Sequence, residues 1–81
     1  MARSSLKSLE IKSALDNLAC IQEIAAADFH ASKSMRDYRA TFLRNEQCVL
    51  RWVSVLKRNG QECPAYIKSH FPAWGYEVVP Q

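Results

Sequence analysis

The chain has 81 residues, an apolar fraction of 48% and a net charge of +3, a composition that excludes a second domain and disorder throughout. It holds three widely spaced cysteines without a CxxC pair, no apolar run suited to a secretory signal, and no stretch approaching the roughly 20 apolar residues of a membrane span. These features predict one cytoplasmic domain over residues 1–81, with reduced thiols and no membrane association.

The first predicted element is a helix over about residues 5–29, whose first turn Ser4 or Ser5 can cap. Leu6, Leu9 and Ile24 lie to one side of its apolar row and widen it. The row itself recurs at helical spacing and consists of Ile11, Leu15, Leu18, Ala25 and Phe29, with Ala14 and Ile21 at its edge. The helix is expected to break over residues 30–33. No Gly or Pro enforces this break, so one continuous rod stays open as an alternative.

The second predicted helix covers about residues 34–58. Ser34 followed by Asp37 resembles a capping box, and Asn59-Gly60 supplies the left-handed residue that ends many helices. Asn45 falls in the apolar seam, where it would either fix the register of a helical pair or lie solvated at the edge. The apolar row of this helix is Met35, Tyr38, Phe42, Val49, Trp52, Val53 and Leu56.

A short third helix is predicted over about residues 64–70, because Pro64 suits a first helical position. The tail over residues 71–81 is predicted to be extended, with Trp74 and Tyr76 either packed on the core or exposed as anchors for a partner. The expected fold is therefore all-α: an antiparallel helical hairpin of two long helices, plus a short third helix and an extended aromatic C-terminal tail.

Basic side chains concentrate in the middle of the chain. Residues 29–70 carry eight basic and three acidic side chains, whereas residues 1–28 carry three basic and four acidic ones. Arg44, Arg51 and Arg58 recur every seven residues, about 10.5 Å apart along a helix, with Lys33 and Arg36 nearby. Such a face can be simply solvated, can bind an acidic protein surface, or can contact nucleic-acid phosphates.

No catalytic, metal or cofactor motif stands out, and none is expected. The candidate ligands Cys20, His30, Cys48, Cys63 and His70 share no recognised metal-ligand spacing. Cys63 and His70 suggest a thiol nucleophile and its base only weakly, because no oxyanion element or orienting acid accompanies them.

The sequence therefore predicts a non-enzymatic protein–protein interaction module, a small regulator, adaptor or inhibitor of a larger complex. Its partner would be a protein with an acidic surface, bound through Lys33, Arg36, Arg44, Arg51 and Arg58. Apolar contacts would come from Leu43, Leu50, Trp74 and Tyr76, and the ridge of Leu43 and Leu50 favours a homodimer. The alternative is a small nucleic-acid-binding regulator that contacts phosphates through the arginine stripe.

Overall fold

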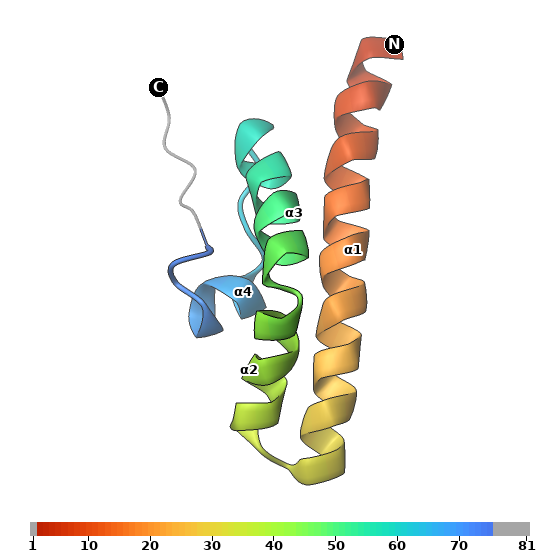
Figure 1. The fold of residues 1–81 in the computed structure, drawn as a ribbon. Helices are drawn as coiled ribbons and strands as arrows, with labels where there is room; N and C mark the ends of the chain where they lie inside the picture. The colour runs from red at the N-terminus through yellow and green to blue at the C-terminus, as the bar shows by residue number, and fades with distance from the viewer. Residues whose placement is uncertain (1, 76–81) are drawn as a thin grey trace.

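The computed structural model describes residues 2–75, and these residues form four helices and no strand. The helices are α1 (Ala2–Ser32), α2 (Met35–Arg44), α3 (Glu46–Arg58) and α4 (Ala65–His70). The prediction of an all-helical chain is confirmed for this part of the sequence. The molecule measures 46 × 24 × 18 Å; α1 lies along its length, and α2 and then α3 run back beside α1 in the opposite direction (Figure 1). None of these four helices has the length and apolar character needed to cross a bilayer.

A connection of two residues reverses the chain between α1 and α2, so these helices are not one rod. Lys33 has a left-handed φ of 56°, a conformation that is unfavourable by about 1 kcal/mol for a residue with a Cβ. The hydroxyl of Ser34 accepts a hydrogen bond from the backbone N–H of Arg36 at 3.1 Å and caps α2, as predicted. The first helix ends later than expected: α1 continues to Ser32, whereas its predicted end was about residue 29.

Asn45 divides the predicted second helix into α2 and α3, so the prediction of one helix over residues 34–58 is wrong at this position. The backbone N–H of Asn45 donates to the carbonyl of Phe42 at 3.1 Å, one residue short of the regular α-helical partner. The carbonyl of Thr41 accepts instead from the side-chain amide of Asn45 at 2.8 Å. A side-chain donor thus takes the place of a backbone donor, and the helix resumes where Val49 donates to the Asn45 carbonyl at 2.9 Å.

The hydrophobic core lies between α1 and the α2–α3 arm and continues between that arm and α4. On α1 the buried row is Ala14, Leu18, Ile21 and Ala25, so the stripe is rotated toward its predicted edge. On the arm, Met35 departs from the prediction, because it stands at the first residue of α2 and remains 43% exposed. The other buried apolar side chains are Tyr38, Phe42, Val49, Val53, Leu56, Cys63, Ile67 and Trp74.

The chain after α3 folds back onto the side of the arm that faces away from α1 (Figure 1). Gly60 has a φ of 72°, and the N–H of Gln61 donates to the Leu56 carbonyl at 2.8 Å, which confirms the predicted helix end. The tail is not extended over residues 71–75, where the N–H groups of Trp74 and Gly75 donate to the carbonyl of Phe71 at 2.8 and 3.1 Å. This turn lets the ring of Trp74 stack on that of Phe71, with centroids 4.5 Å apart.

Candidate protein-binding groove

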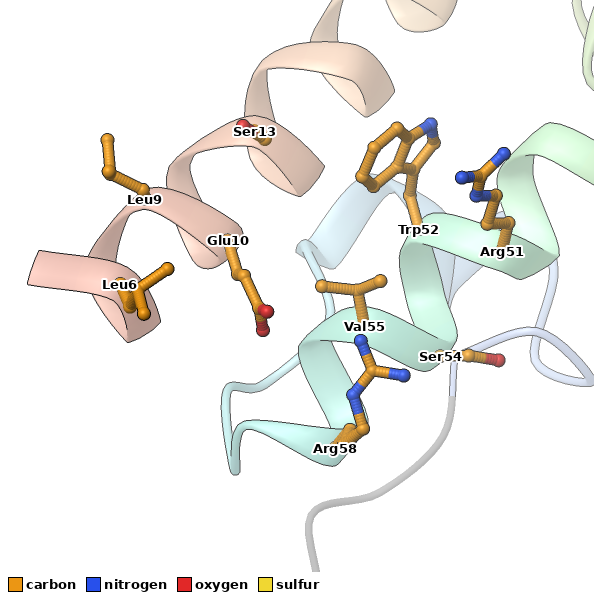
Figure 2. A pocket seen from close by; sticks show the side chains of 9 residues that line it. All are labelled: Leu6, Leu9, Glu10, Ser13, Arg51, Trp52, Ser54, Val55 and Arg58. Atoms are coloured by element: carbon orange, nitrogen blue, oxygen red, sulfur yellow. The ribbon is translucent and has the colours of Figure 1, made fainter. Parts of the chain in front are cut away.

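An open groove runs between the N-terminal half of α1 and the C-terminal half of α3. Its volume is about 570 Å³. The residues on each wall recur at spacings of three, four and seven, so each wall is one face of a helix. The walls consist of Leu6, Leu9, Glu10 and Ser13 from α1, and Arg51, Trp52, Ser54, Val55 and Arg58 from α3 (Figure 2).

The apolar part of the groove is open to water. Leu6 and Leu9 are 65% and 59% exposed, which is unusual for two leucines on neighbouring turns of one helix. Trp52 and Val55 are partly buried against the core and reach from α3 toward α1 (Figure 2). The groove therefore continues the core to the surface as an apolar strip that no other described residue covers.

Two guanidinium groups stand on the α3 wall and one carboxylate on the α1 wall. The guanidinium carbon of Arg51 lies 5.5 Å from the ring centroid of Trp52, a cation–π contact that holds this charge beside the apolar strip. Arg58 lies one heptad further along α3. The carboxylate of Glu10 accepts a hydrogen bond from the amide of Asn59 at 3.0 Å, which positions it on the opposite wall. The groove is thus positive on one side only.

The other predicted basic residues lie outside this groove. Arg44 forms an ion pair with Asp28 of α1 at 3.2 Å and donates to the hydroxyl of Thr41 at 3.0 Å. Asp28 also accepts a hydrogen bond from the buried hydroxyl of Thr41. Lys33 and Arg36 are exposed at the connection between α1 and α2. The three arginines of the heptad row therefore have different surroundings: Arg44 pairs with a carboxylate of α1, whereas Arg51 and Arg58 line the α1–α3 groove.

The predicted apolar contacts do not gather at the groove. Leu43 is exposed on α2, and Leu50 is partly buried against the core, so neither lines it. Trp74 is 7% exposed and packs in the core, which was the other open alternative for this residue. Tyr76 lies outside the described residues.

The groove residues that the predicted site lacks are Leu6, Leu9, Glu10, Ser13, Trp52, Ser54 and Val55. Leu6 and Leu9 carried a signal, because they lie beside the apolar row of the first helix rather than in it. Trp52 fell in the predicted core row of its own helix. Nothing in the sequence indicated that its ring would stand at the edge of that row, only partly buried against the core.

The described residues contain no group of three or more His, Cys, Asp or Glu side chains that could hold a metal ion. Burial raises the pKa of the Cys63 thiol, which disfavours the thiolate that a nucleophile needs. The imidazole ring of His70 is positioned by two tyrosines. Its Nδ1 lies 3.1 Å from the carbonyl oxygen of Tyr66, and its ring centroid lies 5.2 Å from that of Tyr38.

Comparisons of this chain with protein-family models, with curated proteins and with solved structures find no match.

Proposed function

We propose that this protein is a non-enzymatic protein–protein interaction module, a small regulator, adaptor or inhibitor of a larger complex, that binds an acidic protein surface in the α1–α3 groove. The observation that carries the proposal is the juxtaposition of Leu6 and Leu9, both largely exposed, with Arg51 and Arg58 across the same groove. Exposed apolar area supplies affinity, and unneutralised charge beside it selects the partner and speeds encounter.

The residues of the groove favour a role in protein binding over a charged face that is only solvated. A solvated arginine row needs no apolar neighbours, yet Trp52 and Val55 lie between the arginines and α1. Trp and Arg are the residue types that dominate binding energy in protein interfaces, particularly where they surround a desolvated centre. Arg51 and Trp52 already contact each other, so a partner would meet a preformed pair rather than two mobile side chains.

A pair of charge reversals tests the proposal by capture from the native host with mass spectrometry. R51E/R58E reverses the charge on the α3 wall of the groove. The control R36E/R39E changes the net charge of the protein by the same amount, at exposed positions of α2 that do not line the groove. We expect wild type and R36E/R39E to retain the same partner and R51E/R58E to lose it. Circular dichroism confirms that both variants fold. Loss of the partner from both variants, or from neither, would contradict binding in the groove.

The second candidate is nucleic-acid binding through the arginine stripe, supported by the heptad spacing and the net charge of +3. It is less well supported because Arg44 pairs with Asp28 and the groove floor is apolar. A gel shift with duplex DNA discriminates the two functions. Affinity for the duplex that falls steeply with salt, and that R51E/R58E weakens more than R36E/R39E, would favour nucleic acid, because the arginines of the stripe would make the phosphate contacts.

A further inference from the structure

The geometry of the α1–α3 groove, on which the proposed function rests, also identifies the form of its occupant. We propose that the groove receives an amphipathic α-helix of a partner protein that carries two carboxylates seven residues apart on the flank facing α3.

The shape matches a third helix. The lining residues span Leu6 to Ser13 on α1 and Arg51 to Arg58 on α3, a rise of about 10.5 Å or two helical turns on each wall. Two antiparallel helices leave a furrow along their seam, and a third helix packs into such a furrow with its own ridge of apolar side chains. An occupant with apolar residues at spacings of three and four would therefore face Leu6, Leu9, Trp52 and Val55 together.

An extended peptide suits the groove less well. Both walls are α-helical, α1 over Ala2–Ser32 and α3 over Glu46–Arg58, so most of their backbone N–H and C=O groups are bonded within the helix. In the last turn of α3, the carbonyls of Val55, Leu56 and Lys57 accept hydrogen bonds from N–H groups of the following residues 59–61. An extended chain gains its affinity from backbone hydrogen bonds to a free strand edge, and the described residues contain no strand. A helix brings its backbone already satisfied and needs only side-chain contacts.

The charges fix which flank of the partner helix is acidic. Arg51 and Arg58 stand on the α3 wall and are separated by one heptad, so carboxylates one heptad apart on a parallel axis can face both. Glu10 stands on the α1 wall and would repel a third carboxylate there. The partner helix should therefore be acidic on the α3 side and neutral or basic on the α1 side.

A second copy of this chain fits the same surface poorly. A symmetric dimer opposes identical patches, so it would bring four guanidinium groups from Arg51 and Arg58 against two carboxylates from Glu10. The net repulsion in a partly desolvated interface opposes association. The helix that fills the groove is thus expected to belong to a different protein.

Selection from displayed peptides tests the inference with defined probes. Two libraries of random sequence, one on a helix-forming scaffold and one on an unconstrained linear scaffold, are selected on the chain of residues 1–81. We expect enrichment of helical clones with Asp or Glu at positions seven apart beside an apolar stripe. Synthetic peptides from these clones should bind R51E/R58E at least tenfold more weakly than wild type or R36E/R39E. Replacing the two acids by Lys should restore binding to R51E/R58E.

The outcomes separate the inference from the proposed function. Enriched clones that are linear, or acidic without the seven-residue spacing, and that still lose affinity for R51E/R58E would overturn the helical occupant and leave the groove as a binding site. Clones that bind R51E/R58E as well as wild type, or no enrichment from either library, would overturn both. Light scattering that shows a dimer disrupted by R51E/R58E would assign the groove to a second copy instead.

Discussion

Removal of the Phe42 ring should destabilise the protein more than truncation of its exposed neighbour Leu43. Phe42 is fully buried, and its ring centroid lies 5.3 Å from that of Tyr38, 6.4 Å from Tyr66 and 4.9 Å from Phe71. It therefore joins the α2–α3 arm to both α4 and the C-terminal turn. Phe42→Ala should lower the free energy of unfolding by about 3–5 kcal/mol, the range for a buried phenylalanine replaced by alanine. A chain of 81 residues has a total free energy of unfolding of about 4–12 kcal/mol.

Urea denaturation followed by circular dichroism at 222 nm measures this loss, with Phe42→Leu as the variant that keeps most of the buried volume and should lose only about 1–2 kcal/mol. Leu43→Ala is the matched control. Leu43 is adjacent in sequence but 58% exposed, and its truncation should change stability by about 0.5 kcal/mol or less. If Phe42→Ala loses no more than Leu43→Ala, then the aromatic cluster does not hold α4 against the arm.

Three further predictions concern the pH dependence and two local structures. Burial raises the pKa of Tyr66 to about 12, so the folded state favours the neutral phenol. The free energy of unfolding should therefore be unaffected by this group below pH 10 and should fall by about 1–2 kcal/mol between pH 10 and 12. The fall is limited because the phenol is only partly buried. Urea denaturation at pH 9 and 11 should show a smaller fall for Tyr66→Phe than for wild type. Gly60→Ala should cost about 1 kcal/mol, because its φ is 72° while no atom crowds an added Cβ; an unchanged urea midpoint would contradict backbone strain as the cause. Thr41→Val should cost about 1–3 kcal/mol, because it removes the hydroxyl that donates to Asp28, and Asp28→Asn, which keeps an acceptor oxygen, should cost less.

Local sequence signals predicted the ends of the helices better than their interiors. Ser34 and Gly60 confirmed their predicted roles, because a cap hydroxyl and a left-handed glycine act within a few residues and need no tertiary contact. The break at Asn45 was not predicted, although asparagine is a modest helix former. A single asparagine in a helical pattern bonds to the preceding turn in some contexts and to solvent in others, and only the packed structure decides between them.

The sequence predicted only part of the candidate site, because its spacing pattern describes single helices and not contacts between helices. The seven-residue spacing placed Arg51 and Arg58 on one helix face, and both do line the groove. Arg44 shares that spacing but pairs with Asp28, a contact between residues on different helices that periodicity does not reveal. The role of Leu6 and Leu9 could not be predicted without knowing how far α3 extends along α1. These exposed leucines form one wall of a groove only because α3 supplies the other wall. Periodicity identifies the face of a helix, whereas a groove requires the relative placement of two.

The connection at Lys33 and Ser34 has a consequence for how the halves of the molecule find each other. So short a tether keeps α1 and the α2–α3 arm at a high effective concentration, and their docking is an intramolecular event whatever the dilution. A chain cut between these two residues would become two fragments that assemble by collision, and its helical content would then depend on protein concentration. We therefore expect a cut at this position to convert the folding of this protein from a unimolecular into a bimolecular reaction.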